Sequence, residues 1–372
     1  MILNPFITSG YVGPDYFCDR EIESSQVILD IEGRMNKVII SPRRMGKTGL
    51  ILHCFHNSRI SDNFYCFFVD IYSTLNLSDF VMRLGNRICE TLKPRGKRAV
   101  EFFCQMVRSL EFRVGFDSQG MLGASFDLRD IKDPQRTLDE IFHYLDQADK
   151  PCVVAIDEFQ QISKYPEANA EALLRTYIQH CPNAVFIFAG SKRHMIQNMF
   201  FSASKPFYHS ASVLNLKPIP VEKYVPFVVD LFKKNQKIIS HEEVEYVYEL
   251  FEGHTWYMQN IFYLAFYMTQ KECSRDILNN AIQKRIDDSG EIYEALLYGV
   301  SEKQQGLLKA IALSGKADKI QSAEFIKRYG LPSASAVQSA AKRLLENDLI
   351  TIENGMYQMN DRFFGMWICK NF

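Results

Sequence analysis

KVIISPRRMGKTGLIL, residues 37–52, is the stretch that decides the fold of this chain. An apolar run at residues 37–40 precedes a loop that ends in Gly46-Lys47-Thr48, and apolar residues resume at Leu50. This order of strand, tight loop and helix indicates a phosphate-binding loop of the Walker A type. The alternative is a chance Gly-Lys-Thr at an ordinary helix start. The motif predicts ATP or ADP with Mg²⁺ as the ligand.

The residue types of the loop fit phosphate chemistry. Phosphate oxygens are bound by backbone N–H groups at a helix N-terminus, and Gly46 lets the backbone come close. We expect Lys47 to contact the β- and γ-phosphates and Thr48 to bind Mg²⁺ through its hydroxyl. Ser41 stands where such loops have their first glycine, which is acceptable if its φ is negative. The predicted nucleotide-binding residues are Arg43, Arg44, Met45, Gly46, Lys47, Thr48 and Gly49.

A second motif is the apolar run Cys152–Ile156, which ends in Asp157-Glu158. A strand of a parallel sheet is buried on both faces, so it is apolar throughout, and its carboxyl end faces the ligand. We interpret this as a Walker B strand, in which Asp157 holds Mg²⁺ and Glu158 activates the attacking water. The alternative is a buried strand that ends in two solvated acids.

A further apolar run, residues 184–189, leads into Gly190-Ser191. If this strand lies beside the Walker B strand, Ser191 is placed to reach the γ-phosphate or the water. Capping of the next helix is an equally good interpretation of Ser191.

Composition describes an ordinary globular protein of two or three domains, because 372 residues exceed one small core and 47% are hydrophobic. The net charge of −1 excludes a bulk attraction to nucleic acid or to anionic membrane. We expect no membrane segment and no secretory signal at the N-terminus. The nine cysteines are scattered without a C-x-x-C pair, which favours free thiols in a cytoplasmic protein rather than disulfides or zinc.

The pattern along the chain predicts an α/β fold, a P-loop NTPase doubly wound parallel sheet with an all-helical lid and a C-terminal winged helix. Apolar runs at residues 37–40, 64–70, 152–157, 184–189 and 212–216 are the expected strands. We place the nucleotide-binding core at residues 1–216, with a β-hairpin insertion at about 111–128 around Gln119-Gly120. The lid spans residues 217–298 and the winged helix residues 299–372.

The winged helix is predicted from three helices that are followed by a hairpin with an Asn354-Gly355 turn. Residues 301–372 hold 10 Lys and Arg against 7 Asp and Glu, a mild basic bias. Its third helix offers Gln338, Ser339, Lys342 and Arg343 as candidate DNA contacts. Docking of a protein partner is an equally good interpretation of this domain.

These motifs together resemble the archaeal and bacterial ATPases of the AAA+/STAND group, and the architecture is similar to that of archaeal replication initiators. The resemblance rests on SPRRMGKTGL, VVAIDEFQ, FIFAGSKRHM and YQMNDRFFGMW, and on Asp15–Glu21, which resembles a box that precedes the first strand in that group. It implies that Arg20 lies near the adenine and that residues 253–257 form the second sensor region of the lid.

Two positions depart from the family pattern. The box at residues 253–257 lacks the arginine that such lids place against the γ-phosphate, and His209 stands where an arginine finger is expected. Lys205 is near that position but lacks the planar guanidinium group. No arginine finger is identified, so oligomerisation stays open.

The leading hypothesis is therefore an ATP-binding switch that hydrolyses ATP slowly or conditionally. In this hypothesis hydrolysis or exchange changes the angle between core and lid and moves the winged helix toward a DNA or protein partner. The alternative is a nucleotide-gated interaction protein that does not hydrolyse ATP. The C-terminal aromatic residues are expected to pack against their own domain, with a partner site as the alternative.

Overall fold

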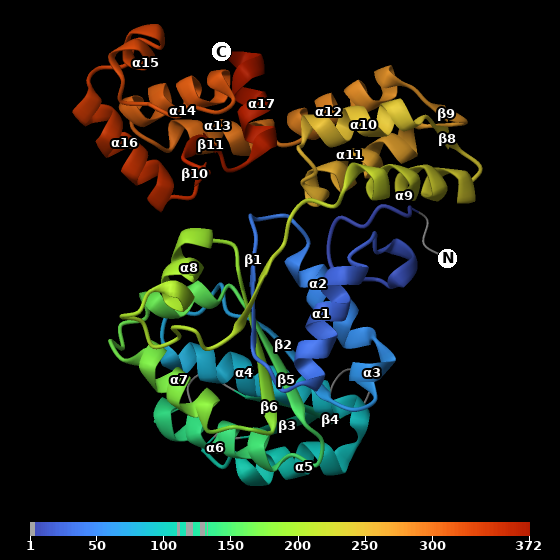
Figure 1. Ribbon diagram of the computed structural model, residues 1–372, viewed down its shortest axis with the longest axis vertical. Coiled ribbons are helices and arrows are strands. Elements are labelled where there is room, and N and C mark those ends of the chain that lie inside the picture. Colours follow the sequence, from blue (N-terminus) through green and yellow to red (C-terminus); the bar gives the residue numbers. More distant parts are fainter. Residues whose placement is uncertain (1–3, 110–111, 117–121, 127–130, 132) are drawn as a thin grey trace. The chain divides into compact units, whose positions relative to one another are not determined.

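The computed structural model describes residues 4–109, 112–116, 122–126, 131 and 133–372. They form two compact units (Figure 1). The core unit is Ser9–Ile219, and the carboxyl-terminal unit is Pro220–Phe372 together with the described residues up to Thr8. The boundaries predicted after residues 216 and 298 stay predictions, since the observed division follows Ile219 and keeps lid and winged helix in one unit.

The core unit contains the predicted sheet. Its five strands are all parallel and lie in the order β2-β5-β6-β1-β7. They are β1 (Lys37–Ile40), β2 (Tyr65–Asp70), β5 (Cys152–Asp157), β6 (Ala184–Gly190) and β7 (Ser212–Asn215). The register aligns Asp70 with Asp157 and Ile40 with Gly190. The carboxyl ends of β1, β2, β5 and β6 therefore meet at one edge, where the polar residues of both Walker motifs emerge.

Both faces of this sheet are covered by helices, which explains why its strands are apolar throughout. Val153 and Ala155 of β5 pack on one face with α1, α2 and α3, whereas Val154 and Ile156 pack on the other. The helices of the core unit are α1 (Glu21–Glu32), α2 (Lys47–His56), α3 (Ser58–Ser61), α4 (Leu77–Leu92), α5 (Lys97–Met106), α6 (Pro134–Gln147), α7 (Ala170–Gln179) and α8 (Arg193–Phe201).

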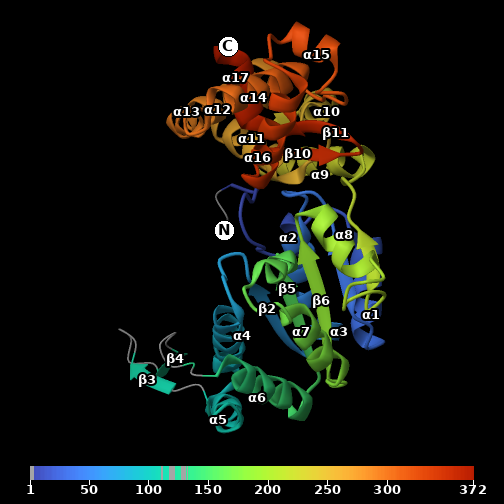
Figure 2. The same ribbon diagram turned by 90° about the vertical axis from the view of Figure 1, so that its left-hand side faces the viewer.

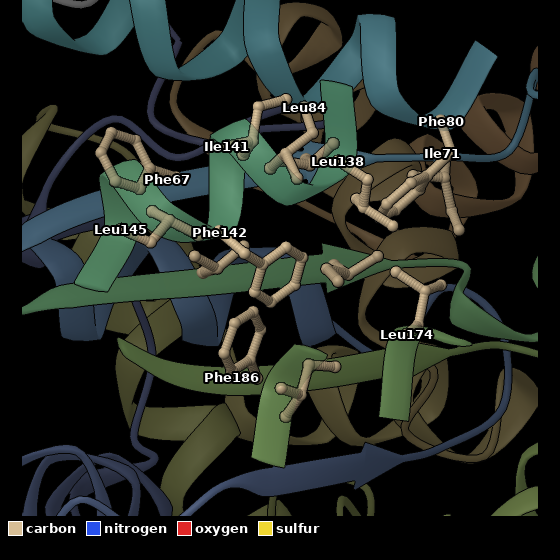
Figure 3. Packing of buried hydrophobic residues seen from close by; sticks show 14 of the residues in the cluster. Phe67, Ile71, Phe80, Leu84, Leu138, Ile141, Phe142, Leu145, Leu174 and Phe186 are labelled. Atoms are coloured by element: carbon tan, nitrogen blue, oxygen red, sulfur yellow. The ribbon is translucent and has the colours of Figure 1, made fainter. Parts of the chain in front are cut away.

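Figure 3 shows the larger of the two apolar layers, where aromatic and branched side chains interlock between the sheet and its helices. The rings of Phe142 on α6 and Phe186 on β6 are stacked with their centroids 5.7 Å apart. Phe80 and Leu84 of α4 lie in the same layer. This layer packs against β5, which ends at Asp157, and against β6, which Ser191 follows directly.

The hairpin insertion consists of β3 (Phe112–Phe116) and β4 (Leu122–Phe126), which pair antiparallel (Figure 2). The predicted turn at Gln119-Gly120 and the ends of the predicted range lie outside the described residues. Helices α1, α5 and α7 were not predicted from the sequence, although α5 and α7 are amphipathic, with Phe103 buried on α5 and Leu174 and Ile178 buried on α7.

The lid is formed by α9 (Val221–Lys234), α10 (His241–Leu250), α11 (Thr255–Met268), α12 (Arg275–Asp287) and α13 (Gly290–Tyr298). It is not entirely helical, which corrects the prediction. Ile238–Ile239 (β8) pairs in parallel with Glu272–Cys273 (β9). These two-residue strands join α9 to α10 and α11 to α12, and two residues are too few to produce a recognisable pattern.

The predicted winged helix is present as three helices, a hairpin and a closing helix. Its elements are α14 (Glu302–Ser314), α15 (Ala323–Arg328), α16 (Ala334–Glu346), β10 (Ile350–Glu353), β11 (Met356–Met359) and α17 (Arg362–Asn371). Ser333 caps α16 by accepting a hydrogen bond of 3.3 Å from the Ala336 N–H. The C-terminal aromatic residues follow the expectation only in part. Phe363 and Phe364 are buried within their own unit and Trp367 is partly buried, whereas Phe372 is 52% exposed.

The carboxyl-terminal unit also contains the first described residues of the chain. Phe6 is buried among three lid aromatics, with ring centroids 5.5 Å from Phe232, 5.5 Å from Phe262 and 6.0 Å from Phe266. The Asn4 side-chain amide donates to the Tyr263 carbonyl at 2.9 Å. The N-terminal segment is therefore an integral part of the lid, although the chain enters the core unit directly after it.

Candidate nucleotide site

The phosphate-binding loop connects β1 to α2. Gly46 has φ 89°, a left-handed conformation that glycine adopts without steric cost, and it immediately precedes the first residue of α2. Arg44 also has a positive φ, 66°. The φ of Ser41 is not positive, and the residue is buried. Ser41 therefore completes the loop without needing to be a glycine.

Lys47 is the central cation of this loop. Its side chain is only 6% exposed, and its Nζ donates long hydrogen bonds of 3.3 Å to Ser41 Oγ and to the Pro42 carbonyl. Among the described residues, no carboxylate lies within ion-pair distance of Nζ. Burial lowers the pKa of Lys47, and the attraction of Asp157 and Glu158 offsets this only in part. A buried ammonium held by neutral oxygens alone is a favourable place for an anion.

Thr48 and Asp157 form the second part of the site. The Thr48 hydroxyl donates to Asp157 Oδ2 at 2.8 Å, and the Glu158 N–H donates to Asp157 Oδ1 at 2.9 Å. Burial raises the pKa of Asp157, while the hydrogen bond from Thr48 and the charge of Lys47 act in the opposite direction. The two motifs thus meet in space, although they lie far apart along the chain.

Glu158 is held by a short hydrogen-bond network. Its Oε2 accepts from Ser191 Oγ at 2.8 Å and from Gln160 Nε2 at 2.5 Å. Ser191 Oγ in turn accepts from Arg43 Nε at 3.2 Å. Ser191 does not cap α8, because that helix has no side-chain cap, so the capping interpretation is wrong. The network connects the phosphate loop, β5 and β6.

These side chains line a cavity of about 340 Å³ at the carboxyl edge of the sheet. Its walls include Arg43, Arg44, Met45, Gly46, Lys47, Thr48, Asp157, Glu158 and Ser191. Asp70 and Tyr72, which follow β2, also line the cavity and were not expected there. Asp70 ends an apolar strand as Asp157 does, and this shared pattern was the signal in the sequence.

Arg20 and Gly49 do not line this cavity. The Arg20 guanidinium donates to Glu23 Oε1 and to the Lys217 carbonyl, both at 2.7 Å, and is buried. Arg20 therefore connects α1 to the last residues of the core unit. Gly49 lies in α2, where an added Cβ would be 3.6 Å from the Phe17 ring. Their predicted roles in nucleotide binding stay predictions.

The two positions that depart from the family pattern have defined surroundings. Lys205 forms an ion pair of 3.1 Å with Glu171, and His209 has φ 50° and donates its N–H to the Phe200 carbonyl. In the lid box, Tyr257 is buried, and its hydroxyl donates to the Asn360 carbonyl at 3.2 Å and accepts from the Arg362 N–H at 3.1 Å. Tyr257 therefore joins the lid to the winged helix.

The candidate DNA contacts share one exposed face of α16. Gln338, Ser339, Lys342 and Arg343 are all exposed, whereas Val337, Ala341 and Leu344 are buried. Arg343 forms an ion pair of 3.2 Å with Glu346 one turn later.

The fold and the cavity define a P-loop NTPase of the AAA+ type with a lid and a winged helix. The sequence profile described as "ATPase domain predominantly from Archaea" matches residues 17–261, and one described as "Probable winged helix domain" matches residues 291–370. The chain belongs to this family of archaeal-type ATPase domains.

Solved structures share the fold at low sequence identity. The Walker-type ATPase PABY2304 of Pyrococcus abyssi is 17% identical with a TM-score of 0.67, and the match covers 98% of this chain and 99% of that chain. The ORC2 protein of Aeropyrum pernix, solved as ADPNP-ADP complexes, is 13% identical with a TM-score of 0.62, covering 98% and 96%. The ORC1 protein of Aeropyrum pernix, solved with DNA, is 12% identical with a TM-score of 0.54, covering 96% and 94%. None of the curated proteins compared matches this chain.

Among the described residues, no helix has the length and apolar character needed to cross a membrane.

Proposed function

We propose that this protein binds ATP with Mg²⁺ in the cavity, hydrolyses it slowly or conditionally, and acts as a nucleotide-dependent switch. The observation that carries this proposal is the buried Lys47 ammonium, which lacks an anionic partner among the described residues and faces the cavity with Thr48. A triphosphate supplies the missing negative charge at the N-terminus of α2, where the helix dipole also favours an anion.

The residues around Asp157 fit Mg²⁺. A hydroxyl and a carboxylate already lie 2.8 Å apart, and hard cations prefer such oxygen ligands. Thr48 and Asp157 would hold the ion, directly or through water. When bound, Mg²⁺ would neutralise charge on the phosphate oxygens.

Hydrolysis is assigned to Glu158, which would orient the attacking water, with Ser191 beside it. We propose slow or conditional turnover for two reasons, both of which concern the positive charge available at the γ-phosphate. Lys205 is paired with Glu171, and the lid box has no arginine to add positive charge at the γ-phosphate.

We propose that the winged helix binds duplex DNA or a protein partner through the exposed face of α16. The ORC1 structure shows that one protein of this fold binds DNA. The nine cysteines are all free thiols, which supports a reducing, cytoplasmic compartment. In this scheme the nucleotide state changes the relation of core and lid and thereby moves the winged helix.

The second candidate is a nucleotide-gated interaction protein without hydrolysis, which His209 and the arginine-free lid box favour. Nucleotide binding and phosphate release by purified protein distinguish the two. We expect Mg²⁺-dependent ATP binding that Lys47→Ala abolishes and phosphate release that Glu158→Gln abolishes without loss of binding. The control is Lys150→Ala, since Lys150 precedes β5 at the opposite edge of the sheet.

Binding without phosphate release by the wild type would establish the second candidate. Equal release by wild type and Glu158→Gln would exclude the assigned role of Glu158. Failure of the wild type to bind ATP would overturn both. Repeating the measurements with duplex DNA, together with size-exclusion chromatography, shows whether a partner or self-assembly stimulates turnover.

A further inference from the structure

Gln160 is a buried polar residue next to the site that the motifs do not account for. It lies in a short 3₁₀ helix, Phe159–Lys164, directly after the Walker B strand, and is 3% exposed. Phe159 anchors this helix, because its ring is fully buried and lies 4.5 Å from the ring of Phe188. The backbone that carries Gln160 is therefore fixed by the core.

The orientation of the Gln160 amide follows from its neighbours. Its Nε2 lies 2.5 Å from Glu158 Oε2, and an ionised carboxylate only accepts hydrogen bonds, so the NH₂ group must face Glu158. The amide Oε1 is then directed away and has no hydrogen-bond partner among the described residues. A buried acceptor without a donor is unfavourable, so another requirement must keep the amide in this position.

Gly190 makes this position possible. A Cβ on residue 190 would lie 2.2 Å from Gln160 Oε1 and 2.6 Å from Ile196 Cγ1, so only glycine admits the amide here. Gly190 is the last residue of β6 and directly precedes Ser191. The strand end that presents Ser191 therefore also makes room for Gln160.

Both donors act on the same oxygen of Glu158. Gln160 and Ser191 approach Oε2 from two different elements and fix the carboxylate against rotation. Glu158 itself has φ 57° and ψ 37°, a left-handed conformation that is unusual for a residue with a side chain. The other carboxylate oxygen, Oε1, is left to accept a hydrogen bond from a molecule in the cavity.

We propose that Gln160 is a positioning residue for Glu158, and that Gly190 is the residue that admits it. This inference rests on the proposed hydrolysis of ATP, in which Glu158 orients the attacking water. Gln160 itself touches neither nucleotide nor water. Its hydrogen bond determines which carboxylate oxygen faces the cavity and at what angle, and catalytic rates depend steeply on such placement.

The first test replaces Gln160 by methionine, which has a similar volume and no donor. We expect kcat for phosphate release to fall by about 10-fold to 100-fold, with KM and the Kd for ATP unchanged, because the lost contact is not with substrate. Gln160→Leu, which also lacks a donor, should show the same loss. It serves as the test if the methionine variant does not fold. Unchanged kcat in a folded variant would overturn the proposal.

The matched control is Gln161→Met. Gln161 is the next residue of the same 3₁₀ helix, and its Nε2 donates to the Thr74 carbonyl at 3.0 Å instead of to Glu158. A general disturbance of this helix would affect both variants alike, whereas positioning of Glu158 affects only residue 160. Equal losses of kcat in both would also overturn the proposal.

A second measurement does not depend on turnover. Unfolding of Glu158→Ala, Gln160→Ala and the double variant forms a double-mutant cycle, and we expect the two single losses of stability not to add. Additive losses would show that the contact is absent and overturn the proposal. If the cycle shows coupling but Glu158→Gln retains full phosphate release, the proposed catalytic function fails and the contact stands.

The role of Gly190 is tested in the same way. Gly190→Ala should lower kcat in the wild-type background and have a smaller effect in the Gln160→Ala background. The added methyl group also meets Ile196, but it does so in both backgrounds, so this effect cancels when the two changes in kcat are compared. Equal effects in both backgrounds would remove Gly190 from the proposal.

Discussion

Thr48 Oγ1 donates to Asp157 Oδ2 at 2.8 Å, which joins the first turn of α2 to the end of β5 across 109 residues of sequence. This hydrogen bond connects the two Walker motifs before any ligand is considered. β1 and β5 are not adjacent in the sheet, but only β6 separates them. Their carboxyl ends are therefore close enough for this contact. The site is thus preformed by the strand order.

The first prediction concerns Thr48. Thr48→Val keeps the side-chain volume and removes the hydroxyl, so the affinity for ATP with Mg²⁺ should fall about tenfold, roughly 1.4 kcal/mol. Affinity measured with EDTA in place of Mg²⁺ should change little. The control is Thr176→Val, because among the described residues that hydroxyl bonds only to the Ala172 carbonyl, on the exposed side of α7. An unchanged affinity with Mg²⁺ would exclude Thr48 as a ligand.

The second prediction concerns the protonation of Lys47. Burial lowers its pKa in the free protein, and a bound phosphate would raise it again. As the pH rises through this lowered pKa, a growing fraction of the free protein has a neutral Lys47, which must take up a proton when ATP binds. The affinity for ATP should fall over the same pH range. Calorimetry in two buffers of different ionisation enthalpy measures this uptake. Lys47→Arg, if it binds, should show none, because arginine stays charged.

The third prediction concerns Glu252, which lies between lid and winged helix. Its carboxylate accepts from Arg362 at 2.7 Å and from Lys316 at 2.5 Å. Burial alone would raise the pKa of Glu252, but these two cations outweigh it and lower the pKa to about 2. A lowered folded-state pKa stabilises the protein above the unfolded pKa, near 4.5, and this stability is lost as pH falls toward 2.

Glu252→Gln should therefore lower the melting temperature at neutral pH, and the difference from wild type should shrink between pH 4.5 and 2. The effect is modest because the carboxylate is partly exposed to water. Glu249→Gln near the end of α10, three residues before Glu252, is the control, since Glu249 is exposed and forms no ion pair among the described residues. A pH-independent difference would contradict the assigned ion pairs.

The fourth prediction concerns the N-terminal segment. Phe6→Ala removes a ring buried among Phe232, Phe262 and Phe266, so the free energy of unfolding should fall by roughly 3–5 kcal/mol. Urea unfolding followed by far-UV circular dichroism measures the loss. Phe201→Ala removes a ring that is 45% exposed and should cost much less. Equal losses in the two variants would mean that the segment is not part of the lid core.

The fifth prediction concerns α16. Lys342 is exposed and forms no ion pair among the described residues, unlike Arg343. If duplex DNA is the partner, Lys342→Ala should weaken binding similarly for all sequences and reduce the slope of log K against log salt by about 1. Lys303→Ala at the start of α14 is the control. Salt-independent or absent DNA binding would favour a protein partner instead.

The sequence predicted the sheet and both Walker motifs because each is local. An apolar run that ends in a polar residue identifies a buried parallel strand, and residues 37–40, 152–157 and 184–189 all have that form. The positions of Lys47, Thr48 and Asp157 at the carboxyl edge follow from this pattern alone. The winged helix was equally predictable, because Ser333 and Asn354-Gly355 mark a helix start and a hairpin turn.

The contacts between distant elements depended on the tertiary structure. No single segment of the sequence predicts three of these contacts. They are the hydrogen bond of Arg20 to Lys217, the packing of Phe6 in the lid, and the contact of Tyr257 with the winged helix. The same holds for Asp70 and Gln160 at the cavity. Strand order and register decide which residues surround them. Strand order and register depend in turn on many weak packing interactions throughout the core, whereas a motif can be recognised from its own few residues.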